Sequence, residues 1–311
     1  MKTALVTGSA GFVGSHLVPK LEAAGYAVWG FDPREERTML LGTLEASVPA
    51  SRGARMRGRF ERCSPLAIEP EEFDLIVHLA ANIKDISKRL EMDLQAFSDI
   101  ALDYAVAEYV LEHPPREAFI APSSCAIDTP EDPYSWVKLT GERFWMALYR
   151  AGVPTVILRP YSGYGEDQSE SYPFPAILGR AIRKEDPLVV WGDGQQVRDF
   201  IHIEDLTDAF IWAIERAPRG IPIDIGTGSG TPFVALARMI AQQVGYEPKL
   251  ECDTSKPASS PRRVANPRVA TEFGFQTRIS LEEGVRRAVV VRRGCRQARM
   301  VAPKEFKCQT M

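Results

Sequence analysis

Residues 3–16 read TALVTGSAGFVGSH, and this stretch decides the fold. Its apolar, β-branched beginning predicts a buried strand, and its end begins an amphipathic run that predicts a helix. Between the two, Gly8, Gly11 and Gly14 give the spacing G-x-x-G-x-x-G. Glycines in such a turn allow a tight bend, a close approach of the backbone to a ligand, and close packing of the helix on the strand. The start of the helix then presents N–H groups to the ligand, which favours a phosphate group.

An acidic residue, Asp32, ends the next predicted strand, where a carboxylate can accept hydrogen bonds from ribose hydroxyls. The glycine turn and this carboxylate together predict a bound dinucleotide. A carboxylate at this position repels a 2′-phosphate, so we expect NAD as the cofactor. Arg34 offers the alternative of holding a 2′-phosphate, but beside two glutamates we interpret it as a solvated loop residue. The cofactor contacts expected here are Gly8, Gly11, Phe12, Val13, Gly14 and Asp32.

The first half of the chain alternates short apolar runs with amphipathic stretches. This pattern predicts an α/β fold, a Rossmann-type doubly wound parallel sheet with helices on both faces. We expect strands at residues 3–7, 27–31, 75–79, 118–121 and 155–158, and helices at residues 12–24, 90–112 and 134–150. Later in the chain we expect a strand at residues 188–191 and helices at residues 176–184, 204–215, 232–244 and 281–291.

The texture of the sequence changes near residue 160, where proline, glycine and tyrosine become frequent. We therefore predict a cofactor-binding domain over residues 1–160, rejoined by parts of 188–225. A smaller C-terminal α/β lobe, mainly residues 161–290, would bind the substrate. The basic tail at residues 291–311 has no clear period and is expected to be disordered.

The composition is that of a globular enzyme, with 311 residues of which 45% are hydrophobic and 25% are charged. A formal net charge of -3 argues against a whole-chain attraction to nucleic acid or to anionic lipid. The apolar stretches are shorter than the roughly 18 residues that span a bilayer, and the N-terminus lacks a cleavable signal pattern, so we expect a cytoplasmic protein. Five cysteines without a CxxC pair argue against a disulfide framework or a structural zinc site, and no metal is expected.

Candidate reacting groups follow the fourth predicted strand of the first half. Ser124 comes at the end of a strand, and Tyr134 and Lys138 begin a helix. Because residues four apart share a helix face, the lysine ammonium can lie beside the tyrosine phenol. A neighbouring cation favours the phenolate, which is a usable base for oxidising an alcohol. An ordinary exposed Tyr–Lys pair is the alternative, but the nucleotide-binding context favours the catalytic reading.

A series of ordered motifs over residues 3–290 resembles the extended short-chain dehydrogenase/reductases, specifically the NAD-dependent nucleotide-sugar epimerase/dehydratase group. The motifs are TGSAGFVGSHL, HLAA at 78–81, APSS at 121–124, YSWVK at 134–138, LRPYSGYGEDQ at 158–168 and WGDGQQVRDFIHIEDL at 191–206. The resemblance implies that Ser124 hydrogen-bonds a sugar hydroxyl, Tyr134 exchanges its proton, and Lys138 holds the nicotinamide ribose. It also implies cofactor contacts for the backbone of Leu79, Ala80 and Ala81.

The resemblance further implies a nucleotide-diphosphate sugar as the substrate. Arg198 matches the arginine that binds the diphosphate, a task that suits a bidentate guanidinium. Lys256 or Arg263 would supply a second cation, and the segment around them looks like a loop of GDP-sugar enzymes, which suggests guanine as the base. Ser162 stands where the family usually has an asparagine, so a substrate contact there would be altered.

The resemblance implies epimerisation, most simply at sugar C4, through a transient keto sugar. The Asp-Glu pair that resembles a dehydratase signature is absent after Ser124, and the segment up to Tyr134 is shortened. Cys125 is either a second acid or base, as cysteines are in some relatives, or a small buried thiol, and we favour the thiol. A dehydratase, a reductase or a non-catalytic NAD-binding protein remain alternatives. By analogy within the family we also expect a homodimer formed through the helices at 90–112 and 134–150.

Overall fold

The computed structural model describes residues 1–32, 40–41, 72–81, 89–128, 133–256 and 260–301. The chain divides into two compact units. Unit 1 consists of Met1–Gly163, Asp199–Gly230 and Arg263–Arg278, and unit 2 consists of Tyr164–Arg198, Thr231–Arg262 and Ile279–Met311.

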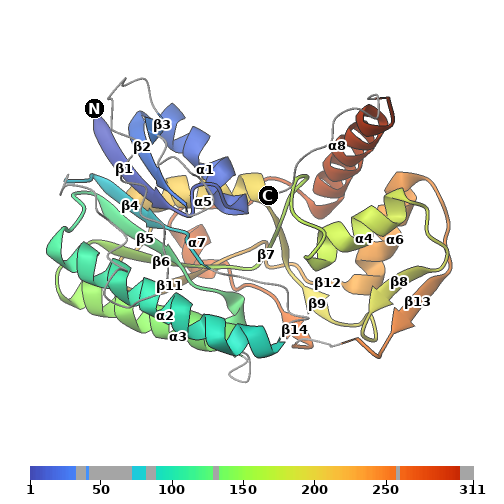
Figure 1. The fold of residues 1–311 in the computed structure, drawn as a ribbon, viewed down its shortest axis with the longest axis horizontal. Coiled ribbons are helices and arrows are strands. Elements are labelled where there is room, and N and C mark those ends of the chain that lie inside the picture. The colour runs from blue at the N-terminus through green and yellow to red at the C-terminus, as the bar shows by residue number, and fades with distance from the viewer. Residues whose placement is uncertain (33–39, 42–71, 82–88, 129–132, 257–259, 302–311) are drawn as a thin grey trace. The chain divides into compact units, whose positions relative to one another are not determined.

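Unit 1 is built on a seven-stranded sheet with the order β11-β6-β5-β4-β1-β2-β3 (Figure 1). Its strands are β1 Lys2–Thr7, β2 Tyr26–Phe31, β3 Leu40–Leu41, β4 Leu75–His78, β5 Ala118–Pro122, β6 Thr155–Pro160 and β11 Pro222–Ile225. Neighbouring strands are parallel except β2 and β3, which are antiparallel. This confirms the predicted Rossmann-type sheet. The order changes direction at β1, which has β2 on one side and β4 on the other, and ligands of such sheets bind at the carboxyl ends beside this point.

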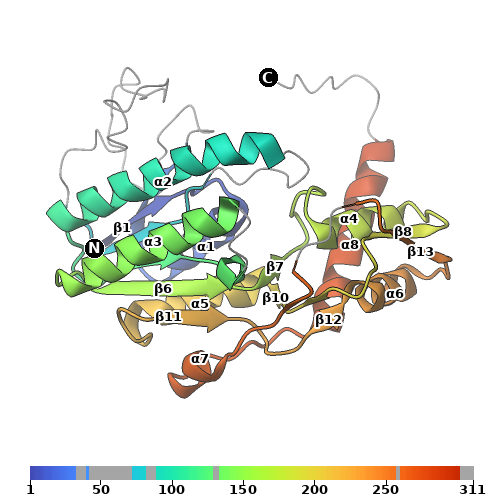
Figure 2. The same ribbon diagram turned by 90° about the horizontal axis from the view of Figure 1, so that it is seen from below.

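Helices cover both faces of this sheet, with α2 and α3 on one side and α5 on the other (Figure 2). On unit 1 the helices are α1 Phe12–Ala23, α2 Arg89–Glu112, α3 Pro133–Arg150, α5 Ile203–Glu215 and α7 Arg268–Glu272. Successive residues of β1 point to opposite faces: Leu5 packs with the core of α2 and α3, whereas Ala4 and Val6 pack with the core of α1 and α5. The apolar run that predicted a strand therefore fills two cores at once.

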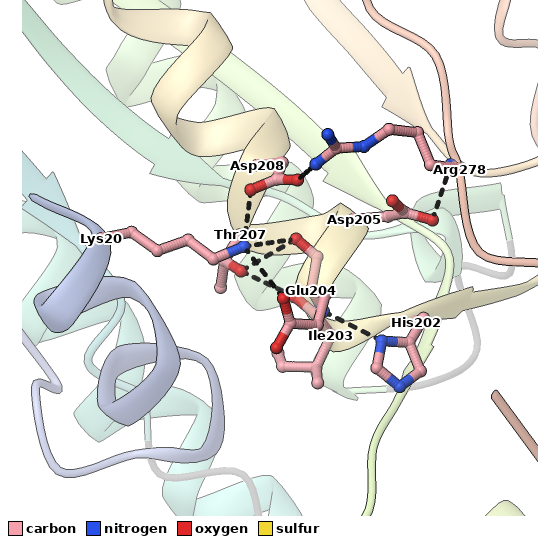
Figure 3. A network of polar contacts seen from close by, with 8 residues as sticks. All are labelled: Lys20, His202, Ile203, Glu204, Asp205, Thr207, Asp208 and Arg278. Carbon is pink, nitrogen blue, oxygen red and sulfur yellow. Dashed lines mark hydrogen bonds and ion pairs between the residues drawn. The ribbon is translucent and has the colours of Figure 1, made fainter. Parts of the chain in front are cut away.

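A polar network joins α1 to α5 and to the last segment of unit 1 (Figure 3). The Lys20 ammonium lies 2.5 Å from the Asp208 carboxylate and donates to the Glu204 carbonyl oxygen at 2.8 Å. The Arg278 guanidinium pairs with Asp208 from the other side, and its backbone N–H donates to Asp205 Oδ2 at 3.0 Å. These contacts hold the end of unit 1 against the helix that follows the glycine turn.

Unit 2 contains three helices, α4 Pro173–Ile182, α6 Phe233–Val244 and α8 Leu281–Val301, among the residues that the structure describes. The strands β8 Leu188–Trp191 and β13 Leu250–Asp253 pair in parallel, and β9 Val197–Arg198 and β12 Thr231–Pro232 pair antiparallel. The remaining short elements of the chain are η3 Cys125–Asp128, β7 Ser162–Tyr164, β10 Phe200–His202 and β14 Arg262–Arg263. None of the helices in the described ranges is both long and apolar enough to cross a membrane.

The C-terminal segment differs from the predicted disordered tail at residues 291–311. Helix α8 continues to Val301, and residues 302–311 lie outside the described part of the chain. The basic residues that suggested disorder serve as anchors: Arg292 Nε donates to the Glu166 carbonyl at 2.7 Å, and Arg293 donates to the Val244 carbonyl. Because these contacts reach residues far away in sequence, no local pattern predicted them.

Candidate functional site

The glycine turn meets two other strands at the carboxyl edge of the sheet. Gly8 has a φ of +74°, and its N–H donates to the Phe31 carbonyl oxygen at 2.6 Å. A Cβ atom on Gly8 would lie 2.7 Å from the backbone of both Leu79 and Ala80. Only a glycine fits there, because both the backbone conformation and the space exclude a side chain. The turn, the Asp32 end of β2 and the segment after β4 are thereby brought together, as the cofactor prediction requires.

The start of α1 is open to an anionic group. Gly11 is the N-cap residue and offers no side-chain acceptor to the first turn, which also lacks an acidic residue. The Ser9 Oγ atom is buried and has no hydrogen-bond partner among the described residues. A Cβ on Gly14 would lie 2.3 Å from the Gly8 carbonyl oxygen, so the helix and the turn pack in direct contact. Unused N–H groups, an unused hydroxyl and a backbone cradle fit a dinucleotide pyrophosphate.

The other predicted cofactor residues line the same edge. Asp32 directly follows β2 and is only 7% exposed. Phe12, Val13 and Leu79 are half-buried against the apolar core of unit 1, and Ala81, which is also half-buried, ends the described segment after β4. Arg34, the alternative contact to a 2′-phosphate, lies outside the described residues.

Tyr134 and Lys138 lie in the first two turns of α3. The Lys138 Nζ atom is 5.8 Å from the centre of the Tyr134 ring, so the predicted pair shares one helix face. The lysine is buried, which by itself lowers its pKa, but the negative charges of Tyr134, Asp103 and Asp99 outweigh burial and raise the pKa of Lys138 above its ordinary value. The ammonium therefore keeps its charge inside the protein beside the phenol.

Two serines follow β5, and they differ in their hydrogen bonds. Ser124 Oγ accepts the N–H of Ala126 at 3.1 Å, while the buried Ser123 Oγ has no partner among the described residues. Ser135 Oγ donates to the Ala126 carbonyl at 2.6 Å, which ties the start of α3 to this segment. Ser123, which the sequence analysis did not single out, thus offers an unused hydroxyl next to the predicted one. Its place in the motif APSS was the only available signal.

Cys125 begins η3 directly after these serines. Its sulfur is a thiol, not part of a disulfide, and the residue is only 9% exposed. The Tyr161 hydroxyl donates a hydrogen bond to Asp224 Oδ2 at 3.1 Å. Burial, followed by the charge of Asp224, raises the pKa of Tyr161 strongly, and the charge of Cys125 adds to this effect. This corner of unit 1 is therefore enclosed and polar.

The predicted substrate contacts Arg198, Lys256, Arg263 and Ser162 divide between the two units. Arg198 and Lys256 belong to unit 2, and Ser162 and Arg263 belong to unit 1. The Arg198 guanidinium is buried against the Phe233 ring, 5.7 Å from its centre. The contacts of these side chains were not visible in the sequence pattern.

An aromatic residue that sequence reasoning missed accompanies Lys256. The Lys256 Nζ atom lies 5.7 Å from the centre of the Trp191 ring, and this ring is 43% exposed. An exposed ring beside a cation suits a flat, anionic ligand. Trp191 opens the motif WGDGQQVR, and this position was the signal that could have identified it.

Asp199, which follows Arg198, organises the substrate-side loops of unit 1. Its carboxylate is fully buried and accepts the N–H groups of Thr227 at 3.0 Å, Gly228 at 2.8 Å and Ala265 at 3.2 Å. The Thr227 hydroxyl donates to the same carboxylate at 2.6 Å. One charged group thereby fixes the segment after β11 and the segment after β14, so its role is to hold loops in place.

Comparisons with known proteins agree on a family and differ in the reaction. A model of the NAD dependent epimerase/dehydratase family matches residues 4–226. GDP-L-fucose synthase 1 of Arabidopsis thaliana is 23% identical, with 90% of each chain covered. The dTDP-4-dehydro-6-deoxy-D-allose reductase of Streptomyces bikiniensis is 27% identical, over 92% of this chain and 95% of that protein. The crystal structure of UDP-glucose 4-epimerase from Thermotoga maritima with UDP-glucose has a TM-score of 0.77 at 26% identity, over 94% of this chain and 99% of the other.

Proposed function

The chain belongs to the NAD-dependent epimerase/dehydratase family, and on this premise we propose that it interconverts the C4 epimers of a nucleotide-diphosphate sugar through a transient 4-keto sugar. The observation that carries the proposal is the buried Lys138 ammonium, 5.8 Å from the centre of the Tyr134 ring, on a helix tied to the end of β5. A phenol, a fixed cation and a serine hydroxyl beside a dinucleotide cradle are the parts that oxidation of an alcohol needs.

In the proposed reaction Tyr134 takes the proton of the C4 hydroxyl, and Ser123 or Ser124 donates a hydrogen bond to the same oxygen. The Lys138 ammonium stabilises the phenolate that starts the cycle. Gly8 and Gly14 would hold NAD, which would supply the acceptor and donor of the C4 hydride, so that the keto sugar can be reduced again on its other face. Tyr134 then gives its proton back to the new C4 alkoxide, so no net oxidation occurs.

We assign the nucleotide-diphosphate part of the substrate to three residues of unit 2. Arg198 and Lys256 supply positive charge for the diphosphate, and Trp191 supplies an exposed ring on which a base can stack. Arg263 and Ser162 remain candidate contacts from unit 1. Guanine is the base to test first, because the Lys256 segment looks like a loop of GDP-sugar enzymes and one relative is a GDP-L-fucose synthase.

A second candidate function is the reduction of a 4-keto nucleotide sugar. The specific observation that favours it is the enclosed Cys125 thiol next to the serines, together with a relative that is a reductase. In this route a reduced nicotinamide cofactor would supply the hydride for C4, while Tyr134 gives a proton to the oxygen and Cys125 exchanges a proton at a neighbouring carbon. The product is then a reduced sugar.

We also propose a homodimer that forms through α2 and α3. Three residues spaced seven apart on α2 are exposed: Phe97 by 68%, Tyr104 by 51% and Leu111 by 53%. Trp136 and Leu139 on α3 are exposed by 50% and 37%. We propose that these five exposed apolar residues, called the α2–α3 apolar stripe, are the surface that a second copy of the chain buries, because exposed apolar surface marks protein interfaces.

The test of the reaction is a panel of UDP-, dTDP- and GDP-hexoses incubated with the protein and NAD, with products identified by NMR and mass spectrometry. A stereoisomer of unchanged mass supports the C4 epimerase. Loss of the mass of water contradicts it in favour of a dehydratase. Turnover only of 4-keto sugars, with oxidation of the reduced cofactor, favours the second candidate.

Tyr134→Phe tests the role of the phenol. We expect kcat to fall by about a thousandfold, because the base is removed, while NAD affinity stays within about twofold. Tyr149→Phe, on the same helix with a ring that is 45% exposed, is the matched control and should keep full activity. Wild-type turnover by Tyr134→Phe would contradict the mechanism.

A further inference from the structure

A chain of buried polar contacts runs from the glycine turn to helix α2. Thr7 and His78 are paired in register at the ends of β1 and β4, and Thr7 Oγ1 lies 2.7 Å from His78 Nδ1. On the other side of the ring, His78 Nε2 lies 3.0 Å from Asp103 Oδ1. Ala80 N–H donates to Thr7 Oγ1 at 3.2 Å. The three residues are at most 5% exposed, so these contacts are shielded from water.

One arrangement of protons satisfies every group in this chain. A carboxylate only accepts, so His78 Nε2 donates to Asp103, and a neutral His78 then accepts the Thr7 hydroxyl proton at Nδ1. The Thr7 oxygen is left to accept the N–H of Ala80. Asp103 thus sets the tautomer of His78 and, through it, the position of Ala80, whose backbone touches Gly8.

The same carboxylate lies against the helix that carries the reacting pair. A Cβ atom on Gly141 would lie 2.7 Å from Asp103 Oδ2 and 3.2 Å from Trp145 Nε1. Gly141 is three residues after Lys138 and shares its helix face. A glycine at this position leaves room for the Asp103 carboxylate to approach α3 beside the lysine.

Lys138 faces several charged groups from the elements packed around it. Tyr134 comes from its own helix, Asp99 and Asp103 come from α2, and His78 of β4 stands behind Asp103. Burial alone lowers the pKa of Lys138, and the three negative groups reverse this effect. Asp103 is one of these three groups, and unlike Tyr134 it takes no part in the proton transfer of the proposed reaction.

We propose that Asp103 is a positioning residue that acts in two directions: it holds the Lys138 ammonium charged inside the α2–α3 layer, and through His78 and Thr7 it fixes the segment after β4 against the glycine turn. The proposal rests on the proposed function for the role of Tyr134 and Lys138. The contacts of Asp103 themselves do not depend on which sugar is bound.

Direct titration of Lys138 tests the first direction without any substrate. Asp103→Asn keeps the shape and an acceptor for His78 but removes the charge. In protein labelled with 13C-lysine, with the Lys138 signal assigned by its loss in Lys138→Arg, we expect the titration midpoint of Lys138 to fall by about one to two pH units. Glu108→Gln, an exposed change on the same helix, is the matched control and should leave the midpoint unchanged. An unchanged midpoint in Asp103→Asn would overturn the proposal.

The second direction is tested by Thr7→Val, which removes the hydroxyl but keeps the branched shape. We expect the Kd for NAD to rise about tenfold while the Lys138 midpoint stays in place, because only the arm toward Ala80 is broken. Unchanged NAD affinity would remove this half of the proposal. If Asp103→Asn fails to fold, Gly141→Ala replaces it, since the added methyl pushes the carboxylate away from α3 and should lower the Lys138 midpoint in the same direction.

Activity adds a further readout and separates this proposal from the proposed function. In Asp103→Asn we expect kcat to decline at a lower pH on the alkaline side than in the wild type, with KM for the nucleotide sugar unchanged. If the wild type turns over no nucleotide sugar, the proposed function fails, while the lysine titration and the NAD affinities still decide the role of Asp103.

Discussion

Ser123 and Ser124 are adjacent in sequence but differ in the hydrogen bonds that their hydroxyl groups make. Ser124 Oγ holds the backbone of Ala126, whereas Ser123 Oγ is buried without a partner among the described residues. We expect Ser123→Ala to lower kcat about a hundredfold with little loss of stability, because it removes an unused donor near the substrate. Ser124→Ala should instead lower the free energy of unfolding by about 1 kcal/mol, since it releases the Ala126 N–H.

Steady-state kinetics and urea denaturation of both variants measure these effects. Ser171→Ala, an exposed serine of unit 2, is the matched control. The reverse result, with full activity in Ser123→Ala and a large loss in Ser124→Ala, would assign the sugar contact to Ser124, as the family resemblance implies.

At the scale of single residues, the sequence predicts contacts between residues that are close together in the chain. Tyr134 and Lys138 are one helical turn apart, so their contact follows from periodicity alone. Asp103 lies on another helix, α2, more than thirty residues before Tyr134, and no sequence motif links it to the pair. Trp191 could have been found from its motif. Its contact with Lys256 joins the end of β8 to the segment after β13, and no local pattern connects these two parts of the chain.

At the scale of elements, an ion pair joins α3 to β6. Arg159 Nε and Nη2 contact the two oxygens of Glu142 at 2.6 and 2.8 Å, and the Glu142 side chain is only 4% exposed. Arg159→Met would leave a buried carboxylate alone, so we expect the free energy of unfolding to fall by about 3 to 5 kcal/mol. Urea denaturation of Arg159→Met and of the double variant with Glu142→Met measures this. The double variant should recover most of the loss, and equal losses in both would contradict a charge-based explanation.

The type and order of the elements in unit 1 could be predicted because period two and period 3.6 are visible in single segments. The ends were less predictable. Helix α4 begins at Pro173, ahead of the expected residue 176, because proline is well tolerated in a first helical turn. Helix α8 extends to Val301, past the expected residue 291, and Arg292 and Arg293 within it donate to carbonyl groups that lie far away in sequence.

For the whole molecule, the division into units depends on contacts that cross the sequence. Residues 263–278 return to unit 1, which no composition change predicted. Two buried or half-buried acids hold this return in place: Asp199 accepts the Ala265 N–H, and Asp208 pairs with Arg278. Each contact spans more than sixty positions. A pattern confined to neighbouring residues cannot predict such a pairing. The glycine turn and its strand could be predicted because their residues are close together in sequence.

The proposed dimer is the prediction that belongs to the molecule as a whole. Phe97, Tyr104 and Leu111 are spaced seven residues apart and so lie on one face of α2. The centre of the Tyr104 ring is 6.1 Å from the centre of the Phe144 ring of α3. A charge at the centre of an apolar interface is costly, so Phe97→Asp with Leu111→Asp should convert a dimer to a monomer at micromolar concentration. Sedimentation equilibrium measures the mass, and Val290→Asp, an equally simple change at an apolar residue of α8 in unit 2 that is 59% exposed, should leave the dimer intact. A wild type that sediments as a monomer, or a double variant that still dimerises, would show that another surface, or none, joins two copies of this chain.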